Sequence, residues 1–326
     1  MAWDIQYKKG VWLPQIAWWL DGQTRAPRSF ITHAHSDHIA RHAEVVCTPS
    51  TARILHARLP GKRKETLLDF GETRELEFGL KATLLPAGHV LGSSMVRLES
   101  EHGTLLYTGD FKLRPGQAAE VCVPSPADVL VMETTFGLPK YVFPPDAEVI
   151  AALIAFCHQA LADGRTPVLF CYSLGKTQEV LRALAPSGIP VMLDEQAHYL
   201  TGIYGQLGMS FPEYRKFDAR ALGGHIVICP PHNPALLQRI PAARTAVVTG
   251  WAIDPSARFR NRTDAAFPLS DHADFPDLLR LVELVRPKRI LTLHGYAREF
   301  AATLRSRGWD AMAVGRDNQL DLGLGK

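Results

Sequence analysis

The sequence comprises 326 residues, of which 46% are hydrophobic and 21% are charged, and its formal net charge is +3. A chain of this length can bury a large core, and it predicts either two domains or one domain that carries an insertion. The composition excludes a disordered or low-complexity protein. The small net charge also excludes a polycation whose overall charge would by itself indicate nucleic-acid binding. Any phosphate-binding surface must therefore be local.

The cysteines and the start of the chain bear on cellular location. Five cysteines are present, and their odd number, wide spacing and apolar neighbours favour reduced, buried thiols in a cytoplasmic protein. The start has no basic region followed by a long apolar segment. The apolar stretch 11–20 is interrupted by Pro14 and is too short to span a bilayer. We therefore expect a cytoplasmic protein with no membrane partner.

The first third of the chain predicts a β-rich segment. Apolar stretches indicate strands over 11–14, 17–20, 29–32, 76–85, 94–98, 104–107 and 128–132. Several of these stretches run directly into histidine, aspartate or glutamate residues. Because loops at the ends of sheet strands often carry catalytic groups, these polar clusters are the first candidates for a site.

The middle of the chain changes character. Helical spacing is found over 146–163 and 173–184, and it alternates with predicted strands over 167–172, 188–193, 224–229 and 245–249. This alternation favours a small parallel α/β unit. Near the end, helices over 276–285 and 300–307 flank a strand over 289–293 that runs into a histidine. We predict one domain, 1–140 and 268–326, interrupted by a second domain, 141–267.

The strongest chemical signal is the segment from Thr32 to His38, which reads Thr-His-Ala-His-Ser-Asp-His. Imidazole and carboxylate groups are the ligands that zinc and related divalent ions prefer. The His33-x-His35 spacing on an extended segment points both rings to one side, and Asp37 and His38 can reach toward a second ion. A solvated polar loop or a helix cap is the alternative reading, which so dense a cluster disfavours.

Further candidate ligands follow other predicted strands, namely His89, Asp110 and His294. Taken singly, a lone histidine is more often structural than a metal ligand. Together the candidates complete two sets: His33, His35, His89 and Asp110 for one ion, and Asp37, His38, Asp110 and His294 for the other. Two divalent cations can hold and activate a bridging water and neutralise the oxygens of a phosphodiester.

The arrangement of these motifs resembles the metallo-β-lactamase superfamily and, within it, the β-CASP nucleases. An insertion follows Met132-Glu-Thr-Thr-Phe-Gly137 and closes at Pro268-Leu-Ser-Asp-His-Ala-Asp274. The short length is most similar to the bacterial ligase-associated DNA damage response exonucleases. The resemblance implies an α/β fold, namely a four-layer αββα metallo-β-lactamase domain with an inserted α/β β-CASP domain.

The resemblance also implies roles for particular residues. Glu133 matches the first β-CASP motif, His272 the second and His294 the third. His272 would protonate the leaving oxygen, and Glu133 would orient the His272 ring. Asp37 is counted both as a ligand and as a catalytic residue. A structural histidine and a simple strand-end carboxylate are the alternatives for His272 and Glu133.

Two departures from the family pattern concern the substrate. Tyr296 stands where the RNA-processing branch commonly has glutamate, and the stretch 273–275 reads Ala-Asp-Phe where Artemis-type DNA nucleases are rich in serine. His294, in contrast, is a feature of the RNA-processing branch. The choice between DNA and RNA and the preference for one end are therefore open at this point.

Two basic stretches are candidate phosphate contacts. Ser173-Leu-Gly-Lys176 lies between a predicted strand and a predicted helix, where backbone amides and Lys176 can hold a phosphate. Arg258, Arg260 and Arg262 alternate, so an extended segment would place them on one face suited to tracking a nucleic-acid backbone. Ordinary helix capping and a solvated edge are the alternatives for these two stretches.

We predict a metal-dependent nuclease, a DNA exonuclease that acts from a 5′ end in DNA repair, with two divalent ions. Zinc is the expected metal and manganese the alternative. The substrate is nucleic acid, DNA rather than RNA, and the resemblance implies an ATP-dependent DNA ligase and a helicase as partners. The alternatives are an RNA-processing β-CASP ribonuclease, a small-molecule hydrolase of the same superfamily, and a metal-free scaffold subunit.

Overall fold

The computed structural model describes residues 3–231 and 233–314. The chain divides into two compact units. The first unit is built from residues up to 115, 120–141 and from 272 onward, and the second from 116–119 and 142–271. The predicted insertion was 141–267, and the short segment 116–119 was not expected to join it. The ends of the predicted first domain, 1–2 and 315–326, lie outside the described residues.

One sheet of the first unit carries the histidine-rich loop. Its strand order is β1-β2-β3-β4-β5-β6. These strands are Gln6–Tyr7, Val11–Leu13, Trp18–Leu20, Arg28–Phe30, Glu44–Cys47 and Lys64–Leu67. The first three strands pair antiparallel, whereas β3 to β6 are parallel. Helix α1, Pro49–Arg58, makes the crossover from β5 to β6.

The other sheet of the first unit has the order β19-β18-β11-β10-β9-β8-β7. In chain order its strands are Thr73–Glu75, Lys81–Pro86, Ser94–Ser100, Gly103–Tyr107, Val129–Glu133, Arg289–Leu293 and Ala311–Ala313. The strand predicted over 76–85 was partly wrong, because its first turn is the 3-10 helix Glu77–Gly79. Gly79 has φ +70°, which interrupts the extended backbone before β8 begins.

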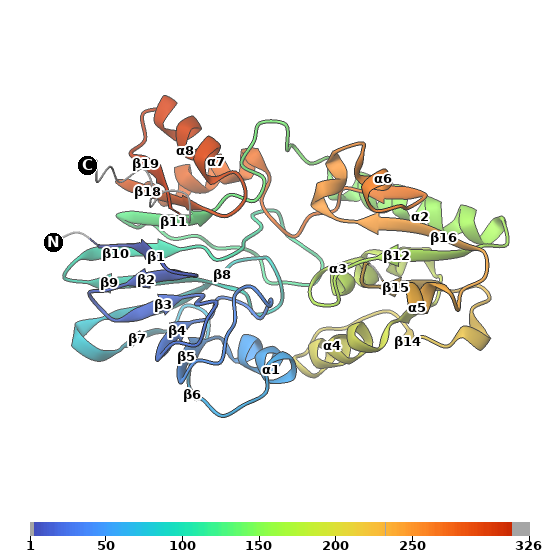
Figure 1. Cartoon of the computed structure of the whole chain (residues 1–326), viewed down its shortest axis with the longest axis horizontal. Coiled ribbons are helices and arrows are strands. Elements are labelled where there is room, and N and C mark those ends of the chain that lie inside the picture. Colours follow the sequence, from blue (N-terminus) through green and yellow to red (C-terminus); the bar gives the residue numbers. More distant parts are fainter. Residues whose placement is uncertain (1–2, 232, 315–326) are drawn as a thin grey trace, which may run out of the picture. The chain divides into compact units, whose positions relative to one another are not determined.

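Alternating side chains explain how this second sheet is covered on both faces. Val129 and Val131 of β11 point into a core shared with the first sheet. Leu130 and Met132 point to the other face, into a core shared with helices α7, Phe275–Val285, and α8, Ala297–Ser306. Figure 1 shows α7 and α8 beside β18 and β19. The predicted mixed α/β class is confirmed.

The second unit is a parallel α/β unit, as the alternation of helices and strands predicted. Its sheet has the order β14-β13-β15-β12-β16-β17, and every neighbouring pair is parallel. In chain order, β12 to β17 are Thr166–Phe170, Val191–Leu193, Tyr214–Lys216, Ile226–Cys229, Ala243–Val248 and Ala265–Phe267. Its helices are α2 Asp146–Ala162, α3 Lys176–Ala183, α4 Glu195–Gln206, α5 Pro234–Leu237 and α6 Ala257–Arg260, with 3-10 turns at Ala185–Ser187, Ala219–Ala221 and Gly250–Ile253.

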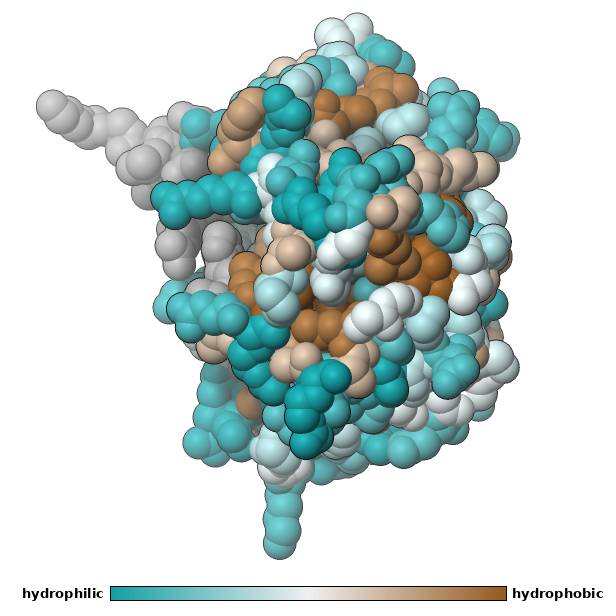
Figure 2. All heavy atoms as spheres, turned by 90° about the vertical axis from the view of Figure 1, so that its right-hand side faces the viewer, coloured by the Kyte–Doolittle hydropathy of each residue, from teal (hydrophilic) through white to brown (hydrophobic). Residues whose placement is uncertain are grey.

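Both faces of this parallel sheet are buried, as such sheets require. Leu169 of β12 packs with apolar residues of α2, α3 and α4, whereas Val168 and Phe170 pack on the opposite face with Leu236 of α5. Figure 2 turns the right-hand side of Figure 1 toward the viewer, where an apolar area lies among polar side chains. Within the described ranges, none of the helices combines the length and apolar character that crossing a membrane requires.

All five cysteines are buried with free thiols, as the sequence predicted. Burial raises the pKa of Cys47, Cys122, Cys157 and Cys229 to about 12, and it raises the pKa of Cys171 still further. Since the thiolate is the reactive form, these groups are both shielded and protonated at neutral pH.

We therefore expect the folded protein at pH 8 to react with Ellman's reagent at none of its five cysteines over minutes, and to react at all five once it is unfolded in guanidinium. A native thiol that is labelled at the rate of free cysteine would contradict the burial described here.

Candidate metal centre

The candidate ligands of the first unit all follow the ends of its strands. The loop 31–38 follows β4, His89 comes three residues after β8, and Asp110 comes three residues after β10. Glu133 is the last residue of β11, and His294 directly follows β18. Short loops on paired strands hold these side chains in fixed positions, which is what a metal centre requires.

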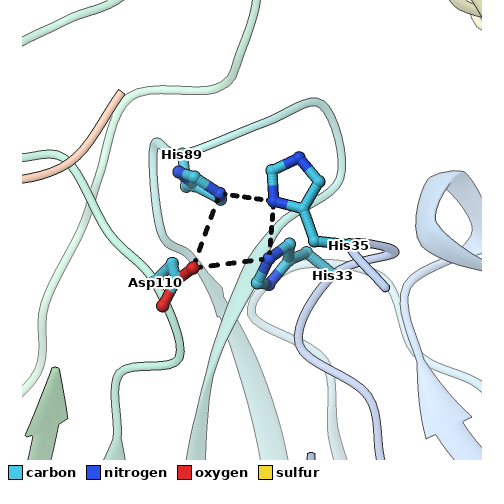
Figure 3. A group of neighbouring side chains, drawn as sticks. All are labelled: His33, His35, His89 and Asp110. Carbon is cyan, nitrogen blue, oxygen red and sulfur yellow. Dashed lines mark hydrogen bonds and ion pairs between the residues drawn. The ribbon is translucent and has the colours of Figure 1, made fainter. Parts of the chain in front are cut away.

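Four of the predicted ligands meet at one point. Figure 3 shows them directed toward one another: His33, His35, His89 and Asp110. His35 Nδ1 lies 3.1 Å from His33 Nε2 and 3.0 Å from His89 Nε2. Asp110 Oδ2 lies 3.6 Å from His33 Nε2 and 3.8 Å from His89 Nε2. Three ring nitrogens and one carboxylate oxygen thus surround a common centre.

This donor set fits a divalent cation. Tetrahedral coordination with bonds of about 2.0–2.1 Å requires ligand atoms to lie roughly 3.3 Å apart, close to the separations observed. Burial, followed by neighbouring His38, His89 and His35, lowers the pKa of His33 well below its ordinary value. His33 is therefore neutral at pH 7, which is the form that donates a lone pair to a metal.

The residues predicted for a second ion are gathered less closely. His38 Nε2 lies 3.3 Å from Asp110 Oδ2 and 3.8 Å from Asp37 Oδ2, and the rings of His38 and His294 are 5.8 Å apart. The Asp37 side chain is 72% exposed. Among the described residues, neither Asp37 nor His294 belongs to a close group of potential ligands. Their role as ligands stays a prediction.

The backbone around His294 is tightly constrained. His294 has φ +60° and Gly295 has φ +53°. A Cβ atom on Gly295 would lie 2.4 Å from Thr135 Cα and 2.5 Å from Thr134 O, so a side chain cannot be accommodated there. The Thr134 hydroxyl also donates to the His294 carbonyl at 2.7 Å. The end of β11 therefore fixes the turn that carries His294.

The buried aspartate Asp21, which was not among the predicted site residues, supports the loop 31–38, called the metal loop below. Asp21 Oδ2 accepts hydrogen bonds from Thr32 Oγ1 at 2.6 Å and Tyr107 OH at 3.0 Å, and it pairs with His38 Nδ1 at 2.9 Å. Its Oδ1 accepts from the Thr32 amide at 2.8 Å. Thr32 Oγ1 in turn lies 3.0 Å from His33 Nδ1. Asp21 therefore orients two of the predicted ligands.

A sequence signal for Asp21 was available. It directly follows the apolar strand β3, and a position after an apolar strand is the pattern that identified the other site residues. The carboxylates Asp110 and Asp21 also raise the pKa of His38, although burial alone would lower it.

Glu133 and His272 form a pair beside the four ligands. His272 Nδ1 lies 2.8 Å from Glu133 Oε1, and the ring centroids of His272 and His89 are 4.6 Å apart. The Glu133 side chain is only 1% exposed, and it also accepts hydrogen bonds from the amides of Phe111 and Thr135. Glu133 is therefore a buried, fixed acceptor, and it determines the orientation of the half-buried His272 ring.

The predicted phosphate contacts lie in the second unit, where their surroundings differ from those expected. Lys176 is buried, and its Nζ donates to the Leu269 carbonyl at 2.8 Å and lies 3.1 Å from Asp271 Oδ1. Ser173 is half-buried, and its carbonyl accepts from Gln178. The Lys176 ammonium thus has internal partners, so its position gives no support to a phosphate contact.

The extended arginine segment was predicted wrongly. Residues Ala257–Arg260 form the short helix α6, so Arg258 and Arg260 do not alternate along a strand. The Arg260 guanidinium donates to Asp254 at 2.8 Å, and the Arg258 guanidinium lies over the Phe259 ring at 4.4 Å. The turn made by Asp254 and Ser256 starts this helix, which removes the single basic face expected from the sequence.

Comparison with known proteins agrees with a metallo-hydrolase fold. Residues 265–314 match the family described as the Zn-dependent metallo-hydrolase RNA specificity domain. The chain is 55% identical to a protein of Opitutus terrae named "Probable DNA ligase" over 327 residues, which covers 99% of this chain and 32% of that protein. It is 27% identical to the rat "5' exonuclease Apollo" over 303 residues, 87% of this chain and 54% of that protein.

A solved structure shares the fold, namely a protein of unknown function from Enterococcus faecalis. It aligns with TM-score 0.61 and 13% identity over 89% of this chain and 79% of that one. The chain thus spans about a third to a half of the length of the curated relatives named above. Over most of its length the chain is thus similar to parts of these relatives, and residues 265–314 match a Zn-dependent metallo-hydrolase domain.

The Asp21 network generates a testable prediction. In Asp21→Asn, an amide group replaces a carboxylate that accepts four hydrogen bonds, so the rings of His33 and His38 lose their fixed orientation. We expect the affinity for zinc to fall by about 10- to 100-fold while the protein stays folded. Competition with a chromophoric chelator measures the affinity, and circular dichroism checks the fold.

The exposed Asp69→Asn serves as the matched control and is expected to keep wild-type affinity. Wild-type zinc affinity in Asp21→Asn would show that Asp21 does not support the centre.

Proposed function

We propose that this chain is a metal-dependent nuclease that hydrolyses phosphodiester bonds, with DNA as its preferred substrate and a 5′ end as its starting point. The observation that carries the proposal is the convergence of three imidazoles and a carboxylate next to the Glu133–His272 pair. Such a site combines a place for a divalent cation with a proton donor, and phosphodiester hydrolysis needs both.

The relatives support the choice of reaction and substrate. One of them is named as a 5' exonuclease and another as a probable DNA ligase, which favours DNA and a role in DNA repair. The matched family carries "RNA specificity" in its description, and this favours an RNA-processing ribonuclease as the second candidate. Association with an ATP-dependent DNA ligase is part of the proposal and rests on the ligase-named relative, whereas a helicase partner rests on family resemblance alone.

The proposal includes two cations, zinc in preference to manganese, and a four-layer αββα arrangement of the first unit. His33, His35, His89 and Asp110 would hold one ion, and Asp37, His38, Asp110 and His294 the other. The position of Asp110 Oδ2 near both His33 and His38 supports a shared carboxylate. The cores on both faces of the second sheet, together with the buried residues of α1, support the layers.

A bound divalent cation supplies Lewis-acid polarisation of the phosphodiester and lowers the pKa of a water molecule. The protein's own contribution is positioning and proton transfer. Glu133 accepts a hydrogen bond from the Nδ1–H of His272, and in the imidazolium form of the ring the Nε2–H is then the proton that passes to the leaving oxygen, which returns the ring to its neutral form. Since Glu133 is fixed by two backbone amides, the ring is held in place before substrate arrives.

End-labelled substrates test the proposal. Single-stranded DNA, duplex DNA and RNA of matched sequence are incubated with the protein and zinc or manganese. We expect DNA to be shortened from its 5′ end and RNA to be cut more slowly. Asp110→Ala and His89→Ala, which each lose a ligand, are expected to reduce cleavage to background while remaining folded. Cleavage of RNA with no degradation of DNA would overturn the substrate assignment.

The leaving-group role of His272 has its own test. His272→Ala is expected to lower kcat on DNA by about 10² to 10⁴-fold, because the leaving alkoxide then lacks a proton donor. It is expected to retain activity on a p-nitrophenyl phosphodiester, whose leaving group needs no proton. Glu133→Gln should show a weaker form of the same pattern.

The control for this test is the exposed His158→Ala, which should behave as wild type on both substrates. Equal losses on DNA and on the p-nitrophenyl ester would assign His272 a structural role instead.

A further inference from the structure

A cavity of about 410 Å³ lies in the first unit, and its lining is strongly basic. Four of its lining residues carry a positive charge and none is acidic; the charged residues are Arg25, Arg41, Lys62 and Arg63. In a protein whose net charge is only +3, this is a local concentration of charge. Such a cavity attracts anions.

The cavity is separate from the metal centre. Its lining comes from the segments that directly precede β4, β5 and β6, which are three parallel neighbours in one sheet. The metal loop 31–38, in contrast, follows the last residue of β4. Parallel strands place all their amino ends at one edge and all their carboxyl ends at the other. The cavity and the metal loop therefore lie at opposite edges of this sheet.

Two of the basic side chains hold the cavity wall. Arg41 Nη1 donates to the Pro60 carbonyl at 2.8 Å, and Arg63 Nη2 donates to the Leu59 carbonyl at 2.5 Å. These bonds fix the segment that follows α1. The positive charges of both arginines also interact favourably with the carboxyl end of that helix, which accounts for their positions. Helix capping does not explain the remaining two charges.

Arg25 and Lys62 make no hydrogen bond or ion pair with any described residue, and both are exposed at the cavity. The acidic residues near them in sequence are already engaged: Asp21 accepts the hydrogen bonds described above, and Glu44 and Glu65 are in ion pairs. Glu44 pairs with Lys64 at 2.8 Å, and Glu65 pairs with His56 at 2.7 Å and Arg63 at 3.3 Å. The charges of Arg25 and Lys62 therefore remain without a counter-charge in this part of the chain.

His42 adds a buried donor to this lining. It is 3% exposed, and its Nδ1 accepts from the Ala26 amide at 3.2 Å, so Nε2 carries the proton. Although the Gly22 backbone is nearby, Nε2 makes no hydrogen bond of good geometry within the described residues. Burial chiefly, with Arg63 acting in the same direction, lowers the pKa of this ring.

We propose that this cavity is a second anion site that binds a phosphate group, either of a free phosphorylated molecule or of a nucleic-acid backbone. Arg25 and Lys62 supply the charge that has no partner, while Arg41 and Arg63 keep the wall in place. A cavity of this volume is within the range of sites that bind small molecules. The site does not depend on the hydrolysis proposed for the metal centre.

The test removes the two unpartnered charges without disturbing the wall. Arg25→Ala/Lys62→Ala is compared with Lys81→Ala/Arg307→Ala, which removes the same charge from exposed residues elsewhere in the first unit. The full chain is kept in chelator so that the metal centre holds no phosphate. Melting temperature is recorded against sodium phosphate at constant ionic strength, with chloride as reference. We expect phosphate to raise the melting temperature of wild type and of the control, and to have no effect on the cavity variant.

A second arm identifies the source of the phosphate. Binding of a fluorescent single-stranded oligodeoxynucleotide is measured by anisotropy across salt concentrations. If the site takes a nucleic-acid backbone, the cavity variant loses affinity, and its salt slope falls by about 0.7 for each contact removed. If oligonucleotide binding is unchanged while the phosphate response is lost, the ligand is a free phosphorylated molecule. Equal responses of both variants and wild type in both arms would overturn the proposal.

Failure of this site can be distinguished from failure of the proposed nuclease. Hydrolysis of a p-nitrophenyl phosphodiester with metal restored reports the metal centre alone. We expect the cavity variant to retain wild-type turnover of that small substrate.

Discussion

The hydrogen bonds accepted by the Asp21 carboxylate are the interaction on which the site depends. They join the end of β3 to the start of the metal loop after β4, and through Tyr107 they join one sheet of the first unit to the other. Burying a carboxylate costs free energy unless its oxygens accept hydrogen bonds. Here every donor belongs either to the metal loop or to strand β10 of the other sheet. The carboxylate is stable only when the loop is correctly placed, and the loop is correctly placed only when the sheets are packed.

Local chemistry was predictable from the sequence, and tertiary contacts were not. The histidine and aspartate residues after predicted strands identified four groups that do converge, because the strands that carry them belong to two sheets that pack on a shared core. Asp21 was missed although it follows an apolar strand, because its partners His38 and Tyr107 come from elsewhere in the chain. Lys176 was predicted to contact phosphate because nothing nearby in sequence reveals its internal partners, Asp271 and the Leu269 carbonyl. Helix α4 was missed although Asp194 caps it, since its apolar positions are few.

The pairing of Glu133 with His272 joins two parts of the first unit that are far apart in the sequence. The two residues are 139 positions apart, and all of the second unit except 116–119 lies between them in sequence. The first unit is therefore incomplete until the chain has returned from the insertion and α7 has packed against the second sheet. Formation of the Glu133–His272 pair is thus a non-local event, and loop-closure entropy opposes it.

The five shielded thiols have a practical consequence. Because no native cysteine competes for a reagent under mild conditions, the unaltered chain is a suitable background for introducing single reporter cysteines. One dye attached to each compact unit would turn the spacing between them into an optical signal, read in real time as nucleic acid is added.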